Sequence, residues 1–154
     1  MVAQIGGEAR ISNPKLAGCK PFLGTWTTVG HHSMMPGITL HGRTVFEWHE
    51  GGAFLCMRTE MDEPRIPSAV AIIGSDDNCG SLTMLYFDER AVSRKFEASF
   101  EGKILRWSRA APGFSQRYVL TLSDDGDSLR GVSSLSKDDV TWEQDMELSY
   151  TRLE

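Results

Sequence analysis

The chain has 154 residues, 40% of them hydrophobic and 24% charged, which is enough for one domain with a sizeable core. Its 16 Lys and Arg against 21 Asp and Glu give a net charge of −5, which argues against a nucleic-acid or anionic-membrane partner. The three cysteines are widely spaced, no apolar run is long enough to span a membrane, and the N-terminus lacks the apolar core of a signal peptide. We therefore expect a cytoplasmic protein with reduced thiols and no membrane span.

The first 20 residues are predicted to form an N-terminal arm, and residues 21–154 a single β-rich domain. Asn13 precedes Pro14, a combination typical of the start of a helical turn because the asparagine side chain can cap it. We expect this turn, over residues 14–16, to close the bottom of the domain.

A strand is expected over residues 22–32, where aromatic, small and β-branched residues follow one another. Alternation along this strand places Gly24, Trp26 and His32 on one face. Trp26 is large enough to plug one end of a barrel, and Gly24 leaves room for a crossing backbone.

Nine further strand-like segments follow, separated by turns that are rich in Gly, Pro, Asn and Asp. They are residues 42–48, 54–61, 70–74, 82–87, 92–101, 104–109, 116–122, 129–135 and 142–150. The connections leave no room for crossover helices, so consecutive strands are expected to pair antiparallel. The sequence therefore predicts an all-β fold, a ten-stranded antiparallel up-and-down barrel, with a β-sandwich as the alternative.

Two segments show a clear inward face. In residues 92–101 apolar and polar positions alternate strictly, and Arg94 shares the apolar face with Phe96. In the last segment the expected inward residues are Trp142, Gln144, Met146, Leu148 and Tyr150. The alternation is poor in the third to fifth segments, so the sequence leaves open which of their faces points inward.

The segment Phe22–Trp26 resembles the opening strand of the calycin superfamily, which includes lipocalin-like and fatty-acid-binding-like barrels. Similarity to a bacterial group of lipocalin-like proteins without an agreed activity covers roughly residues 22–152. It is carried by Gly42–Trp48, Tyr86–Asp88, Val92–Arg94, Pro112–Arg117 and Thr141–Arg152. The resemblance implies a barrel that encloses a small hydrophobic molecule.

Nitrobindin, a ten-stranded barrel that binds haem through a histidine near its C-terminus, shares the Gly24–Trp26 opening. No histidine follows His49 in this chain, so that ligand position is not matched. We therefore expect no haem or other cofactor. We also expect no metal site, because His31 and His32 are adjacent in a strand and point to opposite sides.

Arg94 is the leading candidate for contact with a ligand. A guanidinium on an apolar face is costly unless a carboxylate such as Glu60, a bound anion or the solvent at the barrel mouth receives it. Arg58 is a second candidate, on a strand whose inward face is undecided. Tyr86 and Gln116 are expected to help Arg94 to hold the polar end of a ligand.

The remaining candidates are polar and aromatic residues on the expected inward faces. Tyr118 and Gln144 can contact a ligand or internal water. The aromatic candidates for the cavity wall are Trp26, Phe46, Trp48, Phe96, Trp107 and Trp142. An aromatic wall favours a flat or aromatic ligand.

The sequence thus favours binding of a small hydrophobic molecule, aromatic or carboxylate-bearing, inside the barrel. The alternative is a cofactor-free isomerase, cyclase or lyase in which His32 is the base and Arg94 stabilises a developing anion. A third hypothesis is a packed barrel that forms a homodimer through an exposed face.

Overall fold

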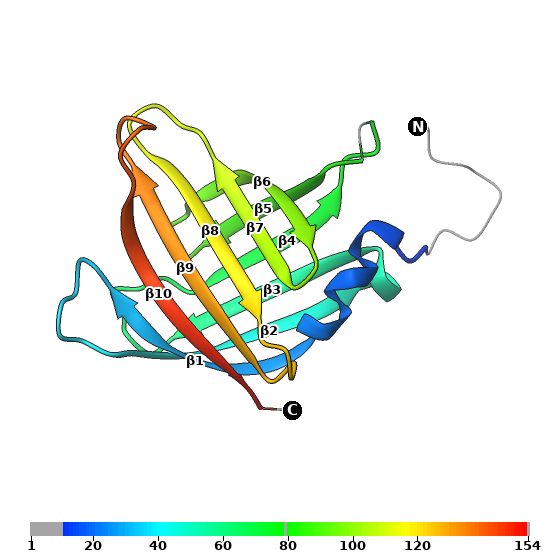
Figure 1. The fold of residues 1–154 in the computed structure, drawn as a ribbon, viewed down its shortest axis with the longest axis horizontal. Coiled ribbons are helices and arrows are strands. Elements are labelled where there is room, and N and C mark those ends of the chain that lie inside the picture. The colour runs from blue at the N-terminus through cyan, green and yellow to red at the C-terminus, as the bar shows by residue number, and fades with distance from the viewer. Residues whose placement is uncertain (1–10, 79, 154) are drawn as a thin grey trace.

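The computed structural model describes residues 11–78 and 80–153, which form a closed barrel of ten antiparallel strands (Figure 1). The strands are β1 (Gly24–His32), β2 (Leu40–His49), β3 (Phe54–Met61), β4 (Ala69–Ser75), β5 (Leu82–Asp88), β6 (Ser93–Glu101), β7 (Ile104–Arg109), β8 (Ser115–Leu122), β9 (Ser128–Ser136) and β10 (Glu143–Arg152). Each strand pairs with its neighbours in sequence, and β1 pairs with β10 to close the barrel. The predicted up-and-down barrel is confirmed and the β-sandwich is excluded. Residues 1–10 of the predicted arm, and Cys79, lie outside the described residues.

A nine-residue 3₁₀-helix, η1 (Pro14–Phe22), covers one end of the barrel, and the short η2 (Glu50–Gly52) joins β2 to β3 (Figure 1). Asn13 caps η1 as predicted, because its side chain accepts a hydrogen bond of 3.0 Å from the backbone N–H of Lys15. The helix is longer than the single predicted turn. Leu16, Cys19 and Phe22 recur at the three-residue period of a 3₁₀-helix, and all three are completely buried.

The η1 end of the interior is tightly packed with aromatic side chains. Phe22 meets Phe46 and Phe100 edge-on, with ring centroids 5.9 and 5.8 Å apart. Burial also raises the pKa of the Cys19 thiol to about 11, so this cysteine stays protonated and acts as a small apolar residue. The end covered by η1 is therefore closed, and the loops β1–β2, β7–β8 and β9–β10 surround the opposite, open end.

The seam between β1 and β10 is secured by Arg152. Its guanidinium lies over the Trp26 ring, with the central carbon 4.2 Å from the ring centroid. The same group donates hydrogen bonds to the backbone carbonyls of Leu23 (2.7 Å), Pro21 (2.6 Å) and Gly126 (2.9 Å). The Arg152 side chain, at the end of β10, thus contacts β1, η1 and the β8–β9 turn at once. In the described part of the chain, no helix has the length and apolar character needed to cross a membrane.

We expect Arg152→Met to lower the free energy of unfolding by roughly 2–4 kcal/mol, because three carbonyl acceptors lose a charged donor and Trp26 loses its cation. Urea denaturation measures this loss. Arg130→Met is the matched control, since Arg130 is exposed and pairs with Glu147 at 2.8 Å on the outer wall, and it should cost less than about 1 kcal/mol. Equal losses in the two variants would contradict a special role for Arg152.

Candidate ligand-binding site at the open end of the barrel

Several inward side chains near the closed end of the barrel are completely buried, whereas in the open half Leu40 is completely buried but many inward side chains are not. Trp26, Phe46 and Leu105, near the closed end, are 0–1% exposed. Inward residues in the open half that are only partly buried include Met57, Thr59, Tyr86, Arg94, Arg109, Gln116 and Met146. Solvent therefore reaches the interior from the open end, and polar groups gather there.

Arg94 and Gln116 meet at this open end. Arg94 is the second residue of β6 and Gln116 the second of β8, and the Arg94 Nη1 donates a hydrogen bond of 3.1 Å to the Gln116 Oε1 across the end of β7. Phe114, in the β7–β8 loop, lies 5.6 Å from the Arg94 guanidinium carbon. Glu60 lies on the outer face of β3 and is not the partner of Arg94. Arg94 therefore lies at the barrel mouth with an uncharged amide, and not a carboxylate, as its partner in the described chain.

A second arginine, Arg109, joins the same group. It ends β7 and pairs in register with Gln116, so its side chain starts from the inward face between Arg94 and Gln116. Within the described residues, neither Arg94 nor Arg109 makes an ion pair with a carboxylate. Two guanidinium groups without acidic partners give this side of the mouth a positive charge that suits a carboxylate or another oxyanion.

The β5 side of the mouth holds a satisfied polar cluster instead. The Asp88 side chain is fully buried and accepts 2.7 Å hydrogen bonds from the Tyr86 hydroxyl and from Arg90 Nη2. The Arg90 guanidinium, helped by the Tyr86 hydroxyl, lowers the pKa of Asp88 to about 2. Burial and the hydrogen bond to Asp88 raise the pKa of Tyr86 to about 12. Tyr86 is therefore a neutral donor committed to Asp88.

Deeper in the barrel, an aromatic wall continues from this mouth. The rings of Trp107 and Tyr118 stack at 4.4 Å with an interplanar angle of 6°, and the Tyr118 and Tyr150 hydroxyls share a 2.6 Å hydrogen bond. Gly131 permits this arrangement, because a side chain there would overlap the Tyr118 phenol. Burial raises the pKa of Tyr150 to about 12, and that of Tyr118 well above its usual value. Both tyrosines are therefore neutral.

One buried polar atom in this region has no hydrogen-bond partner in the described part of the chain. It is the hydroxyl oxygen of Ser133, which starts from the inward face of β9 opposite Tyr118. A buried hydroxyl without a partner is uncommon and leaves a donor and an acceptor available to a ligand or a water molecule.

His32 also lies on the inward face at the open end, but both of its ring nitrogens are engaged. The backbone N–H of Met34 donates to Nδ1 at 3.0 Å, and Nε2 lies 3.5 Å from an Asp145 carboxylate oxygen. The lone pair on the His32 Nδ1 therefore accepts a hydrogen bond from the backbone. This geometry argues against His32 as a general base.

Three of the predicted site residues do not face the interior. Arg58 lies on the outer face of β3 and pairs with Glu47 at 3.0 Å, because Met57 and Thr59 take the inward positions. Gln144 and Trp142 also point outward, since a β-bulge between Gln144 and Met146 shifts the alternation of β10 by one residue. The inward placement expected for these two residues was wrong.

Outward placement gives Trp142 and Gln144 other partners. The Trp142 ring stacks on the guanidinium of Arg117 at 3.9 Å, and the Gln144 amide donates to Glu147 at 3.2 Å. Both partners lie on the outer wall. The other predicted residues, Trp26, Phe46, Trp48, Tyr86, Arg94, Phe96, Trp107, Gln116 and Tyr118, all take inward positions.

Arg109, Asp88 and Ser133 were not identified from the sequence. Arg109 continues the alternation of Leu105 and Trp107, so its inward position could have been found by extending that face by one step. Asp88 stands in a turn-like sequence and Ser133 in a strand of small residues, so neither carried a signal of its own.

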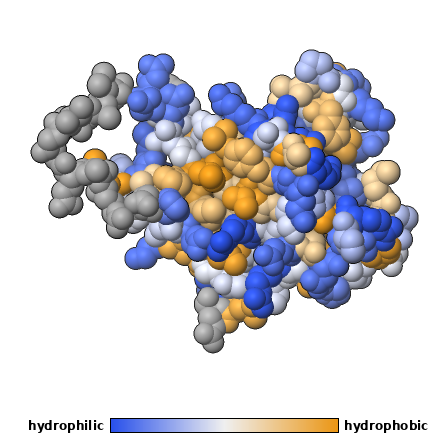
Figure 2. Space-filling view, turned by 180° about the vertical axis from the view of Figure 1, so that it is seen from behind, coloured by the Kyte–Doolittle hydropathy of each residue, from blue (hydrophilic) through white to orange (hydrophobic). Residues whose placement is uncertain are grey.

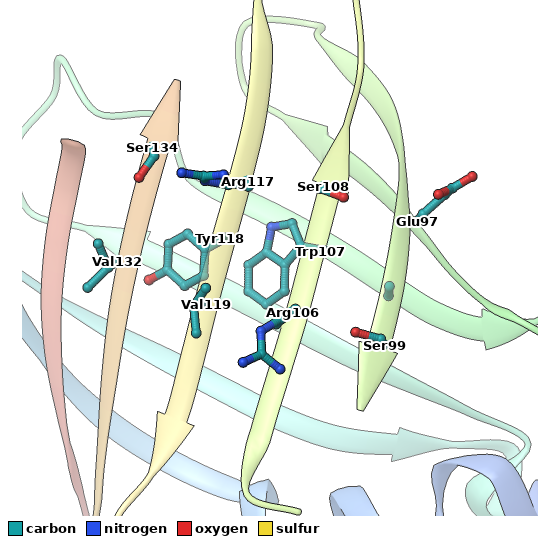
Figure 3. A pocket seen from close by; sticks show the side chains of 11 residues that line it. Glu97, Ser99, Arg106, Trp107, Ser108, Arg117, Tyr118, Val119, Val132 and Ser134 are labelled. Carbon is teal, nitrogen blue, oxygen red and sulfur yellow. The ribbon is translucent and has the colours of Figure 1, made fainter. Parts of the chain in front are cut away.

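A hollow of about 660 Å³ lies on the outer wall over β6–β9 and is distinct from the interior (Figure 3). Its side chains come from the outward positions; they include Glu97, Ser99, Arg106, Ser108, Arg117 and Ser134. Trp107 and Tyr118 border it only because their strands form its floor, since both side chains are 8% exposed and directed inward.

The histidines of the described residues are poorly placed to hold a haem or a metal ion. The inward face carries a single histidine, His32, and its nitrogens are engaged, while His31, His41 and His49 are exposed. No histidine in this part of the chain therefore offers a free nitrogen to a haem inside the barrel. The described part of the chain also holds no group of three or more His, Cys, Asp and Glu side chains arranged to bind a metal.

No protein-family model matches the chain, and no curated protein matches it in sequence. Solved structures match its fold, among them the crystal structure of Rv2717c from M. tuberculosis, with a TM-score of 0.65 and 14% sequence identity. That match covers 94% of this chain and 100% of the other. At this identity the likeness shows the barrel fold alone, so the resemblance to the calycins and to nitrobindin stays a prediction.

The buried Asp88 is expected to make stability depend on acid. Its pKa of about 2 in the folded state lies below the ordinary value of 3.8, so its contribution is complete above that ordinary value and is lost as the pH falls toward 2. Asp88→Asn should therefore flatten the fall in unfolding free energy between about pH 5 and about pH 3, measured by urea denaturation. The control is Asp124→Asn, which removes an exposed carboxylate paired with Lys103. It should leave the dependence of unfolding free energy on pH below about pH 5 nearly unchanged.

Proposed function

We propose that the barrel binds a small hydrophobic molecule that carries an anionic group, such as an aromatic or aliphatic carboxylate. The apolar body lies in the interior against Phe96 and Trp107, and the anion lies at the open end against Arg94 and Arg109. The observation that carries this proposal is the pair of guanidinium groups at the mouth, neither of which has an acidic partner within the described residues.

Three features support this orientation of the ligand. The closed end is filled with buried aromatic and aliphatic side chains, which leaves no partner there for a charged group. The open half retains exposed inward surface, and its walls combine aromatic rings with Met57 and Met146, which adapt to varied shapes. Arg94 is already oriented by Gln116, so an arriving oxyanion needs little reorganisation of the site.

A catalytic role draws no comparable support. The isomerase, cyclase or lyase hypothesis needs a base inside the barrel, and the Met34 N–H occupies the His32 lone pair. Tyr86 is held neutral by burial and by Asp88, so it is a poor base near neutral pH. Binding without turnover is therefore the favoured function.

A pair of fluorescent probes tests the anion site. We expect anilinonaphthalene sulfonate, an aromatic anion, to bind the wild type, and Arg94→Gln or Arg109→Gln to weaken its binding about tenfold through the loss of a charge-assisted hydrogen bond. The uncharged analogue N-phenylnaphthylamine should bind all three proteins equally. The control is Arg58→Gln, which removes an arginine from the outer wall and should change neither affinity.

Two results would overturn the proposal. One is failure of both probes to bind the wild type. The other is an equal loss of both probes in the Arg94 and Arg109 variants, which would mean that these arginines support the fold and not the ligand.

Native mass spectrometry of freshly purified protein adds an independent measurement. We expect a bound mass that disappears on denaturation and decreases in the Arg94→Gln variant.

A further inference from the structure

The outer wall over β3–β5 carries an unusual concentration of apolar side chains, which we call the outer apolar face. It consists of Cys56, Val70, Ile72, Leu85 and Phe87. Leu85 is 44% exposed and Phe87 45% exposed. Figure 2, which views the molecule from behind, shows hydrophobic side chains gathered near the centre of this side with hydrophilic ones around them. Grouped apolar side chains of this kind often mark a contact surface.

The pairing of the strands arranges these residues in two rows across the sheet. The first row runs Glu47, Cys56, Ile72, Leu85, Lys95 and the second runs Arg58, Val70, Phe87. The first row therefore has an acid at one end, a base at the other and Ile72 in the middle. Because neighbouring strands are about 4.8 Å apart, its ends are separated by about 19 Å, too far for a contact within one molecule.

This order of charges is complementary to itself under a two-fold rotation. If a second copy packs face to face with the axis along β4, the first row of one copy lies reversed over that of the other. Glu47 then faces Lys95 of the second copy, and Ile72 faces its own equivalent. In the second row Arg58 faces Phe87, which suits a guanidinium over an aromatic ring. Long side chains at the margins can span the gap that two curved walls leave there.

We propose that two copies of this chain associate through the outer apolar face as a two-fold symmetric dimer, with Glu47 of each copy paired to Lys95 of the other. A two-fold contact uses the same surface on both copies, as these rows require. The face spans only a few strands of a convex wall, so the dimer is weak and its population depends on concentration. The open end and its arginines stay accessible, so the proposal does not depend on the ligand.

Sedimentation over a range of concentrations tests the apolar part of the contact. We expect the wild type to change from monomer to dimer between micromolar and millimolar concentration, and Leu85→Lys to weaken association about a hundredfold, as for a central contact residue. Val29→Lys is the control, because Val29 is 39% exposed on the outer face of β1, away from this surface. A wild type that stays monomeric throughout this range would overturn the proposal.

Charge reversal tests the orientation of the two copies. Glu47→Lys and Lys95→Glu should each weaken self-association about tenfold, because each replaces two attractive contacts with two repulsive ones. An equimolar mixture of the two variants should recover dimerisation as a heterodimer, since both contacts are then between opposite charges. The double variant should also dimerise.

Recovery of dimerisation on mixing is specific to the two-fold arrangement. Glu47→Lys also removes the intramolecular pair with Arg58, but that loss cannot be repaired by adding the other variant. Unfolding midpoints of the single variants, measured in parallel, verify that each is folded. If folded single variants do not recover dimerisation on mixing, the proposed two-fold arrangement is wrong.

Discussion

The seam that closes the barrel, where β1 pairs with β10, is reinforced by the contact between Arg152 and Trp26. A ten-stranded sheet has two free edges unless its first and last strands pair, and this arginine lies at that seam. Its guanidinium covers one face of the Trp26 ring, while its N–H groups satisfy the carbonyls of Pro21, Leu23 and Gly126. The Trp26 indole N–H in turn donates to the Phe22 carbonyl at 3.0 Å. The seam, η1 and the β8–β9 turn are thereby fixed together.

Because one end of the barrel is closed, polar side chains are buried at little cost only where another group inside can accept or donate their hydrogen bonds. Thr28 and Thr44 share a buried 2.8 Å hydrogen bond, and Tyr118 and Tyr150 share one of 2.6 Å, so these hydroxyls satisfy one another. A guanidinium has no such solution in an apolar interior. Arg94 accordingly lies at the open end, where solvent or an anion can complete its hydrogen bonds. The same reasoning applies to Arg109.

The fold was predictable because each strand is short and its turns carry clear glycine, proline and aspartate signals. Alternation also identified the inward face of β6 correctly, including Arg94. It failed on β3, where Cys56 and Arg58 point outward and Met57 and Thr59 inward, so polar and apolar residues occur on both sides. On β4 and β5 the outward positions hold the apolar residues Ile72 and Leu85, so these strands lack the alternation of apolar and polar residues that would mark their inward face. The poor alternation of these strands therefore has a cause, which is the apolar outer face itself.

The failure on β10 has a different physical origin. A bulge leaves no trace in the alternation of hydrophobicity, because Trp142 and Gln144 are ordinary residues for either side of a sheet. The extra residue, Asp145, instead contacts residues at the open end of the barrel. Its carbonyl accepts from the Ser33 N–H at 2.7 Å, and its carboxylate lies 3.2 Å from the Ser33 hydroxyl and 3.5 Å from His32.

The two sides of the open end consequently differ in how far their hydrogen-bonding groups are already committed. On the β1–β10 side, the bulge at Asp145 holds His32 and the start of the β1–β2 loop in place. On the β6–β8 side, Arg94 has only an uncharged amide as its hydrogen-bond partner within the described chain, and Arg109 brings a second positive charge. An incoming anion can gain full ion pairs on the second side without breaking any on the first. In the proposed binding mode, the polar end of the ligand therefore lies toward β6–β8, where Arg94 and Arg109 have no carboxylate partner within the described chain.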